Sequence, residues 1–457
     1  MVTRRSRRLD LRVSGLLYFG QDRYSDRQRV DAERTSAMVG GRVQLRKAAA
    51  LGIATVLTGA LAACGGDSGE EQSGGGSVTL WMYPVIADQA KSQAFWSKVE
   101  TDFEAANAGI DAKIELQPWD GRQEKITTAL AAGKGFDLVV LGPDQIPQYV
   151  EQGTLAPVDD VLTDKAAFAP NAINALSVDD KLYAVPIYHT VNLPVYNKAA
   201  LAKAGITDPP DTWTEIREAA PKLAAAGVSM FHYAGAPNET LNLTFYPFLW
   251  QNGASVFSPD GKSVAFNQPA GVEALQFLLD LEAAGGLQQG AATATTVLDN
   301  TSFLKGTTAA VPTAALSQLP QIEGAIGAEN VVIGEPIEGK SRVSFGIPGG
   351  VVMAKHAEGN EAAKKLAAYL GSAEVMASLA KESGFFPTRP DVQVPDATEQ
   401  ANQFAAALDK MYPGDTHPKA RQVMAVLAPH LQAALQGKKT AQQALDDAAK
   451  EANALLG

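Results

Sequence analysis

After residue 77 the sequence alternates between strand-like and helix-like segments, and this alternation limits the fold more than any other feature. Residues 78–83 are β-prone, and apolar side chains then recur at helical spacing until residue 107. Residues 112–117 alternate apolar and polar side chains, as a half-buried strand does. Residues 136–141 are almost wholly apolar, which is typical of a parallel strand covered on both faces. This β-α-β-α-β order predicts an α/β domain with a mainly parallel sheet, whose ligands bind beyond the carboxyl ends of the strands.

Helix starts are indicated by capping boxes, in which a short polar residue precedes a Glu or Gln by three positions. We assign helix starts to three such pairs, at Asp120–Gln123, Thr212–Glu215 and Thr440–Gln443. Each predicts a helix that begins immediately afterwards. Gly227 is expected to end the second of these helices.

The chain length predicts two domains, because 457 residues exceed what one hydrophobic core usually supports. Twelve of the 39 basic residues and five of the 50 acidic residues precede Cys64, so the remainder carries a net charge of about −18. Such an acidic body is repelled by phosphate backbones, and no basic stripe with interleaved aromatics occurs. Nucleic acid is therefore excluded as an expected partner.

An uncharged segment at residues 48–63 has the layout of a secretory signal, since Arg42, Arg46 and Lys47 precede it and small residues end it. Its sixteen residues are too few for a membrane-spanning helix, which needs about 20. Cys64, the only cysteine, follows Leu61-Ala62-Ala63, a pattern that resembles the lipobox of bacterial lipoproteins. We expect cleavage before Cys64, lipidation of Cys64, and attachment to the outer face of the cytoplasmic membrane.

The flanks of this signal fit the same interpretation. Residues 64–77 are rich in Gly and Ser and predict a flexible tether. Residues 1–37 hold nine Arg and no long apolar run, so we interpret them as an upstream extension from a start codon assigned too early. Met38 is then the first residue, and residues 38–63 form the signal peptide.

The order of motifs along residues 78–457 resembles that of the extracellular solute-binding proteins of family 1, which serve ATP-driven sugar importers and include maltose-binding protein. The motifs that carry the resemblance are 136–140 (FDLVV), 153–158 (GTLAPV), 182–186 (LYAVP), 196–198 (YNK), 210–215 (PDTWTE) and 384–389 (GFFPTR), with further matches at Gly253, Phe303, 305–306 and 349–350. The resemblance implies a two-lobed α/β fold of the periplasmic-binding-protein type (type II), with the ligand in a cleft between lobes joined by crossover strands.

By the same resemblance, one lobe comprises residues 78–187 plus 343–388, and the other comprises residues 188–342 plus 389–457. The implied function is extracellular capture of a mono- or oligosaccharide and its delivery to the permease of an ABC importer. We expect a monomer that needs no cofactor and no metal.

In the first lobe, the candidate ligand residues follow the ends of three predicted strands. A sugar needs carboxylates or amides for its hydroxyls and flat aromatic rings for its C–H faces. Asp144 follows the strand at 136–141 directly, where it serves equally well as a hydroxyl acceptor or as a helix cap. The aromatic and acidic candidates at the other strand ends are Trp81, Tyr83, Trp119 and Asp120; for Trp81, core packing is as reasonable as binding.

Further candidates lie around the predicted hinge and in the second lobe. The hinge candidates are Tyr188, His189, Asn192, Gly350, Phe386 and Arg389, with packing in loops as the alternative for His189, Phe386 and Arg389. The second-lobe candidates are Tyr233, Asn238, Glu239 and Trp250, and the spacing of four between Tyr246 and Trp250 favours core packing for Trp250. A loop predicted at residues 312–318 lacks the stacking aromatic of some sugar binders.

Three functions compete with sugar capture. The first is catalysis: Asp144 and Glu239 offer a carboxylate pair of the glycosidase kind, but the sequence contains no serine elbow, metal-binding His pair, P-loop or nucleotide fingerprint. The second keeps the fold and changes the ligand to a polyol phosphate, an amino acid or a metal. No adjacent tyrosines occur for iron, and Arg389 is the only basic candidate for a zwitterion. The third is a tethered scaffold that binds protein.

Overall fold

The computed structural model describes residues 76–394 and 396–457. The predicted start at Met38, the signal peptide at 38–63, the lipid-accepting Cys64 and most of the tether lie outside the described residues. The last two tether residues, 76 and 77, begin the first strand instead. The described residues belong to one compact unit.

The first sheet has six strands within the described part of the chain, in the order β2-β1-β3-β13-β4 with β7 also paired to β13. β1 pairs in parallel with both β2 and β3, whereas β13 runs antiparallel to β3, β4 and β7. Five strands therefore run one way, and the mainly parallel sheet predicted from the sequence is confirmed. The elements of this first lobe are β1 (Gly76–Met82), α2 (Gln89–Ala106), β2 (Ile110–Leu116), α3 (Arg122–Ala132), β3 (Leu138–Leu141), α4 (Ile146–Glu151), β4 (Leu155–Ala156), α5 (Pro170–Ala175), β5 (Ser177–Val178), β6 (Lys181–Leu182), β7 (Ala184–His189), β13 (Pro348–Ala354), α11 (Glu361–Leu370) and α12 (Ala373–Ser383).

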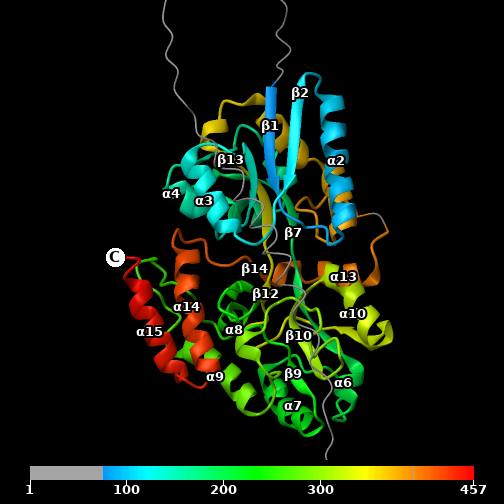
Figure 1. Ribbon diagram of the computed structural model, residues 1–457, viewed down its shortest axis with the longest axis vertical. Helices are drawn as coiled ribbons and strands as arrows, with labels where there is room; N and C mark the ends of the chain where they lie inside the picture. Colours follow the sequence, from blue (N-terminus) through cyan, green and yellow to red (C-terminus); the bar gives the residue numbers. More distant parts are fainter. Residues whose placement is uncertain (1–75, 395) are drawn as a thin grey trace, which may run out of the picture. The chain divides into compact units, whose positions relative to one another are not determined.

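The second sheet has the order β11-β8-β10-β9 and is mixed, because β8 is antiparallel to β10 and β11 while β9 is parallel to β10. Figure 1 shows this sheet with α6 and α7 beside it, and the first sheet with α2 beside β2. The elements of this second lobe are β8 (Asn192–Asn197), α6 (Lys198–Ala202), α7 (Trp213–Ala225), β9 (Ser229–Phe231), η2 (Leu241–Leu243), α8 (Tyr246–Gln251), α9 (Pro269–Ala283), β10 (Thr308–Ala315), η4 (Leu316–Gln318), α10 (Leu319–Ile326), β11 (Val331–Ile333), β12 (Ser344–Phe345), α13 (Glu399–Ala405), β14 (Met411–Tyr412), α14 (Ala420–Leu435) and α15 (Ala441–Asn453).

Local sequence signals explain several element boundaries. The Thr212 and Thr440 hydroxyls each accept a hydrogen bond from the backbone three residues on, so both of these predicted capping boxes are confirmed. The capping box predicted at Asp120 is wrong, because α3 is preceded by Gly121 in a left-handed conformation and no side chain caps it. The loop predicted at 312–318 is also wrong in its first half, since β10 continues to Ala315 before the short helix η4.

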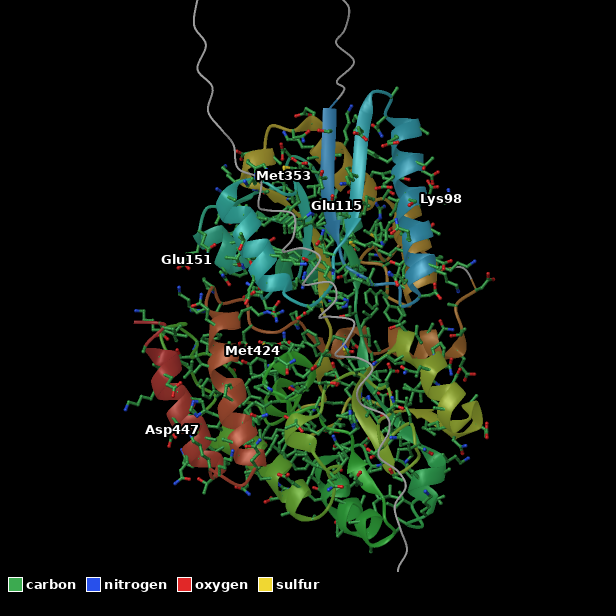
Figure 2. All side chains as sticks on the ribbon, in the orientation of Figure 1. Lys98, Glu115, Glu151, Met353, Met424 and Asp447 are labelled. Carbon is green, nitrogen blue, oxygen red and sulfur yellow. The ribbon has the colours of Figure 1, made fainter. Side chains whose placement is uncertain are left out.

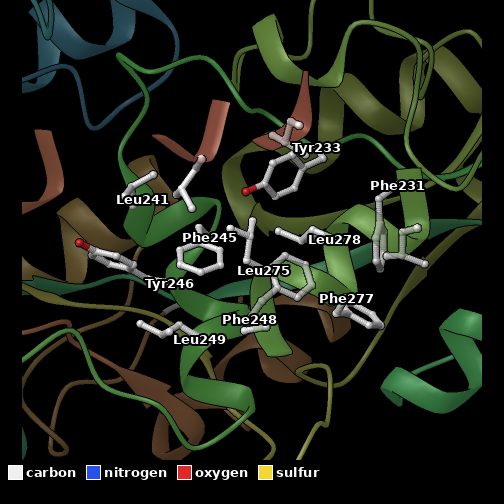
Figure 3. Packing of buried hydrophobic residues seen from close by; sticks show 14 of the residues in the cluster. Phe231, Tyr233, Leu241, Phe245, Tyr246, Phe248, Leu249, Leu275, Phe277 and Leu278 are labelled. Atoms are coloured by element: carbon white, nitrogen blue, oxygen red, sulfur yellow. The ribbon is translucent and has the colours of Figure 1, made fainter. Parts of the chain in front are cut away.

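Each sheet has its own hydrophobic core. The first core is built from buried side chains of residues 78–188 and 351–379, and the second from residues 196–345 and 420–452. Figure 3 shows part of the second core, where Phe248 and Phe277 pack among the leucines of α9. Trp213 stacks on Phe277 with 4.1 Å between ring centroids. Burial of each such ring contributes about 1.5–3 kcal/mol, so each lobe has the means to hold its own shape.

The two sheets are joined by segments that cross between them near the ends of β7 and β13. β7 ends at His189 and β8 begins at Asn192, while Gly346 and Ile347 lead from β12 into β13. A side chain at Gly349 would place its Cβ 2.1 Å from the Tyr188 ring, which only glycine avoids. The crossover segment therefore depends on a close approach of β13 to β7.

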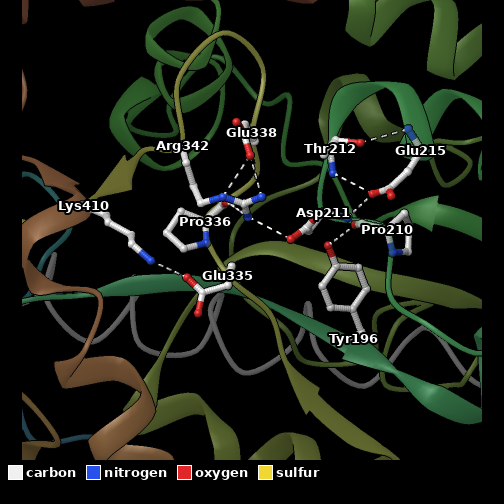
Figure 4. Close-up of polar contacts among 10 residues, drawn as sticks. All are labelled: Tyr196, Pro210, Asp211, Thr212, Glu215, Glu335, Pro336, Glu338, Arg342 and Lys410. Carbon is white, nitrogen blue, oxygen red and sulfur yellow. Dashed lines mark hydrogen bonds and ion pairs between the residues drawn. The ribbon is translucent and has the colours of Figure 1, made fainter.

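A surface network around Arg342 fixes the loop that precedes β12 (Figure 4). The Arg342 guanidinium donates to Glu338, to Asp211 at 2.8 Å, and to the Pro336 carbonyl at 2.9 Å. All three of its nitrogens have partners. Arg342 thus ties this loop to the start of α7.

No helix among the described residues is long and apolar enough to cross a membrane.

Candidate ligand-binding site

Asp144 connects the two lobes from the loop that follows β3. Its side chain is 4% exposed, and its Oδ2 accepts a hydrogen bond from Asn242 at 3.0 Å and forms an ion pair with Arg421 at 2.8 Å. Asn242 lies in η2 and Arg421 in α14, both in the second lobe. The alternative role as a helix cap is not seen, because α4 begins after Gln145 without a side-chain cap. The Asp144 side chain therefore contacts the second lobe and does not cap the helix α4 that follows it.

Several buried polar atoms around Asp144 have no hydrogen-bond partner among the described residues. They are Asp144 Oδ1, Asp415 Oδ2, the Tyr246 hydroxyl and Arg421 Nε. Asp144, Asn242, Tyr246 and Asp415 line one small cavity of about 10 Å³. A buried polar group without a partner costs about 1–3 kcal/mol, so this cluster is poorly suited to stability and well suited to a polar ligand.

The electrostatics of this site are those of two neighbouring carboxyls in a dry environment. Burial, and then the charge of Asp144, raise the pKa of Asp415 to about 6. Burial also raises the pKa of Tyr246 well above its usual value. Tyr246 therefore keeps its proton and is available as a hydroxyl donor, while Asp415 changes charge within a mildly acidic range.

An aromatic pair lies at the ends of β1 and β2. Tyr83 is buried and stacks on Trp119 with 4.9 Å between ring centroids, while Trp119 is 50% exposed. The Arg122 guanidinium lies 4.3 Å from the centre of the Tyr83 ring and donates to the Val140 carbonyl of β3 at 2.6 Å. Arg122 Nε and the Tyr83 hydroxyl are buried without partners among the described residues. The half-exposed Trp119 therefore lies close to two buried polar atoms that have no partner among the described residues.

Trp81 and Asp120 take other positions. Trp81 lies within β1, where its indole donates to Glu115 at 3.0 Å and its ring packs on Phe136. Of the two roles that the sequence allows for Trp81, the structure therefore shows packing. Asp120 is exposed beside Trp119.

Five of the six hinge candidates, all but Arg389, are buried between backbone segments. His189 Nδ1 lies 2.9 Å from the Thr190 carbonyl, and burial lowers its pKa. Asn192 donates to the Phe345 carbonyl at 3.0 Å, and the His189 and Phe386 backbones bond each other. The two others are Tyr188, which packs on Phe385, and Gly350, whose Cβ position is filled by Ala184. These residues join crossover segments to one another.

The remaining candidates make their contacts away from Asp144. Tyr233 packs on Phe248 in the second core (Figure 3). Asn238 is exposed, and Glu239 accepts a hydrogen bond from Thr296 at 2.7 Å. Arg389 is paired with Asp391 and lies over the Phe168 ring.

Trp250 combines packing with an unbonded polar atom. Its ring lies 5.8 Å from Tyr246 on the same face of α8, as the spacing of four predicts, and 4.6 Å from Tyr412. Its indole nitrogen has no partner among the described residues. Trp250 thus borders Tyr246 from the core side.

Comparison with known proteins decides the family. The model for bacterial extracellular solute-binding proteins matches residues 87–377, well over half of the chain. The chain belongs to this family.

Relatives and solved structures agree with this membership. A binding protein of Brucella abortus is 27% identical over 382 residues, which cover 81% of this chain and 92% of the relative. The diacetylchitobiose-binding protein DasA of Streptomyces coelicolor is 34% identical over 175 residues, 36% of this chain and 40% of the relative. An ABC transporter solute-binding protein from Thermotoga lettingae, bound with α-D-tagatose, has a TM-score of 0.71 and 26% identity, covering 83% of this chain and 100% of that chain. The predicted two-lobed α/β fold is confirmed.

Sequence reasoning missed most of this solute-binding protein's polar site. Asn242, Asp415, Arg421 and Arg122 were not among the candidates, and Tyr246 entered only as a helical neighbour of Trp250. The one local signal available was the Gly- and Pro-containing segment 413–418 before α14, where a polar loop precedes a helix. Among the described residues no group of His, Cys, Asp and Glu is arranged to hold a metal ion.

Proposed function

We propose that this solute-binding protein captures an uncharged mono- or oligosaccharide between its lobes and delivers it to the permease of an ABC importer. The observation that carries the proposal is the cluster of buried, unpartnered polar atoms contributed by both lobes around Asp144. Sugar hydroxyls donate to carboxylates and accept from guanidinium and phenol groups, so one ring satisfies acceptors and donors together. The half-exposed Trp119 adds an apolar face of the kind that covers C–H groups.

The names of related proteins support the same class of ligand. DasA binds diacetylchitobiose, and the Thermotoga protein holds a monosaccharide. Relatives that bind solutes also support a role in capture rather than catalysis. The proposal involves no nucleic acid and no cofactor, and the protein acts as a monomer that delivers its ligand to the permease subunits.

Entry of the sugar requires the lobes to separate. The cavity beside Asp144 is only about 10 Å³, and the Asn242 hydrogen bond and the Arg421 ion pair with Asp144 close it from the second lobe. Hinge closure of this kind is one of the common modes of ligand-induced motion, for which periplasmic binding proteins are a standard example. We expect small-angle scattering to show a larger radius of gyration without sugar than with saturating sugar; identical curves would argue against closure.

The proposal includes attachment to the membrane through Cys64. Translation from Met38 and cleavage before Cys64 would leave a diacylglyceryl group on that residue, and two acyl chains are needed because one binds membranes only marginally. The intact mass of protein extracted from its native cells tests this. A product that retains residues 1–37 would contradict it.

The direct test of ligand class is a thermal-shift panel of saccharides, polyols, amino acids and metal ions on the purified protein. A sugar at about 100 times its Kd should stabilise the folded state by about 2.7 kcal/mol, a shift of several degrees at most. Stabilisation by an amino acid or a metal ion alone would overturn the proposal. A saccharide that binds and is also cleaved, detected by product analysis, would reassign the chain as an enzyme.

A further inference from the structure

Asp144 and Asp415 bring one carboxyl group from each lobe to the same small cavity. Asp144 follows β3 in the first lobe, and Asp415 lies between β14 and α14 in the second. Each keeps one buried oxygen, Asp144 Oδ1 and Asp415 Oδ2, without a hydrogen-bond partner in the described part of the chain. Closed lobes therefore hold two carboxyl groups at one cavity. Its other lining residues are Asn242, Tyr246, Val256, Phe257, Ala420 and Met424.

The two carboxyl groups share a single positive charge. Arg421 pairs with Asp144 at 2.8 Å, and among the described residues no cation pairs with Asp415. The cavity of about 10 Å³ has room for about one water molecule, which is too little to hydrate two carboxylates. Burial, and then the charge of Asp144, raise the pKa of Asp415 to about 6. When the lobes separate, water reaches Asp415, and its pKa returns toward the ordinary value of 3.8.

The other ionisable groups near Asp415 either keep their proton or face elsewhere. Burial raises the pKa of Tyr246 on α8 well above its usual value and that of Tyr412 on β14 to about 12, so both stay neutral. His417 stacks on the Phe257 ring with 4.3 Å between ring centroids, and burial lowers its pKa. The next charged side chains are Lys419 and Glu151, which pair with each other at 4.0 Å. Asp415 is therefore the acidic group of this cavity that changes charge between about pH 5 and 7.

We propose that Asp144 and Asp415 form a pH-sensitive switch between the lobes, in which their two charges keep the empty cleft open at neutral pH and protonation of Asp415 in mild acid lets the cleft close without a sugar. The inference rests on the lobe separation that the proposed function requires, and it specifies how that motion is regulated. At neutral pH a sugar permits closure because its hydroxyls donate to the two free carboxylate oxygens.

The switch has a definite size and direction. The closed empty form takes up a proton that the open form releases, so the ratio of closed to open empty protein should rise about tenfold between pH 7 and 5. The closed empty cavity is too small for a sugar, so acid lowers the fraction of protein that is able to bind.

Small-angle scattering of the purified protein without sugar tests the switch at pH 7, 6 and 5, with circular dichroism to verify that the fold is retained. The wild type should have a smaller radius of gyration at pH 5 than at pH 7. Asp415→Asn imitates the protonated carboxyl, so it should be compact already at pH 7 and change no further. Wild-type curves that do not change with pH, or an Asp415→Asn protein that responds as the wild type does, would overturn the switch.

Two variants serve as controls. Asp409→Asn removes an equal charge from an exposed position on the same segment, and His417→Gln removes the neighbouring group that titrates in a similar range. Both should respond to pH as the wild type does, and loss of the response in either would overturn the assignment to Asp415. If Asp415→Asn does not fold, Asp144→Asn removes the opposing charge and should likewise be compact at pH 7; an open Asp144→Asn protein would contradict the switch.

The switch and the proposed function fail separately. The scattering measurements contain no sugar, so an absent pH response would overturn the switch and leave sugar capture intact. Failure of every saccharide in the thermal-shift panel would overturn sugar capture, whereas the response of the empty protein to pH would still be measured.

Discussion

Two regions of this solute-binding protein pair an arginine with carboxylates, and they differ in what is left unbonded. Around Arg342, on the second lobe, every guanidinium nitrogen has a partner, and Glu215 nearby accepts hydrogen bonds from the Asp211 and Thr212 backbones (Figure 4). Around Arg421, between the lobes, one guanidinium nitrogen forms an ion pair with Asp144, and the buried Nε has no hydrogen-bond partner among the described residues. The nitrogens of Arg342 all have hydrogen-bond partners without a ligand, whereas the polar atoms around Arg421 do not.

The two regions shift the pKa of a carboxyl group in opposite directions. Hydrogen bonds from the backbone lower the pKa of Glu215, whereas burial and the charge of Asp144 raise the pKa of Asp415 to about 6. The fold stabilises the charged form of Glu215, as expected of a carboxylate with a structural role. The fold destabilises the charged form of Asp415, so we infer that this carboxyl has a role other than stability. The difference separates a structural ion network from a binding site built of the same residue types.

The largest expected effect is the pH dependence of stability at Asp415. Its folded pKa of about 6 exceeds the ordinary value of 3.8, so between these values the folded state keeps a proton that the unfolded chain loses. Its contribution to the free energy of unfolding is therefore highest below pH 4 and falls by about 3 kcal/mol as the pH rises to 7. Asp415→Asn should remove this fall, measured by urea denaturation at several pH values.

Glu215→Gln is the control of opposite sign. The lowered pKa of Glu215 gives stability that is present above its ordinary value of 4.5 and lost as the pH falls. The deficit of this variant relative to wild type should therefore grow with rising pH. If the difference in the free energy of unfolding between variant and wild type changes with pH in the same direction for both variants, the contrast between the two regions is wrong.

Asp144→Asn should be the substitution most damaging to sugar binding. It removes one or two charge-assisted hydrogen bonds, worth about 1.5–3 kcal/mol each, and so weakens affinity about tenfold or more. Calorimetric titration of the folded variant measures this. Asp211→Asn in the Arg342 network is the control and should leave affinity unchanged. Unaltered affinity in Asp144→Asn would remove Asp144 from the site.

Arg342→Met should show the reverse pattern. It leaves Asp211 and Glu338 without their shared partner in a half-buried network, and the expected loss in the free energy of unfolding is about 1–2 kcal/mol. Denaturation curves measure the loss. Sugar affinity should stay within twofold of wild type; a larger change would mean that this network also shapes the cleft.

The smallest effect is expected at a second ion pair between the lobes. Lys419 Nζ lies 4.0 Å from Glu151 Oε2, with both side chains partly exposed. Figure 2 labels Glu151 on α4 and Met424 on α14, the helix that Lys419 precedes. Lys419→Met should weaken sugar affinity by about 0.2–1 kcal/mol at low salt and by nothing measurable at 1 M, where the screening length is about 3 Å.

Lys410→Met is its control, since Lys410 pairs with Glu335 within the second lobe. Lys410→Met should have the same sugar affinity as the wild type at both salt concentrations. A salt-independent loss in Lys419→Met would assign it a role other than charge.

Most strands and helices were predicted correctly because their sequence patterns depend only on residues that are close together in the chain. The buried run at β3 and the helical spacing of Val99 and Phe103 in α2 follow from residues a few positions apart. Asp120 shows the limit, because a capping residue is chosen by backbone conformation, and Gly121 adopts the left-handed one. The end of β10 was misplaced because pairing with β8 extends it past Pro312.

The polar site was harder to predict because it is assembled from distant segments. Asp144 was found by its position after a strand, but Asn242 and Arg421 are 98 and 277 positions further on, and nothing local marks them. Arg421 lies on an amphipathic helix, where arginine usually indicates a solvated face. Aromatic type was equally ambiguous: Tyr233 and Tyr83 are both buried in hydrophobic cores, whereas Trp119, which stacks on Tyr83, is half exposed.

The placement of β13 also sets the order in which the chain is able to fold. β13 covers the open side of β3, yet it follows β3 by about 200 residues, most of which build the second lobe. At a synthesis rate of about 5–20 residues per second, β3 waits roughly 10–40 s for this partner. During that time its four apolar residues form an unpaired edge, the kind of strand that associates with other chains. The first lobe to begin synthesis therefore stays incomplete until much of the second lobe has been made, and newly made chains need protection over that interval.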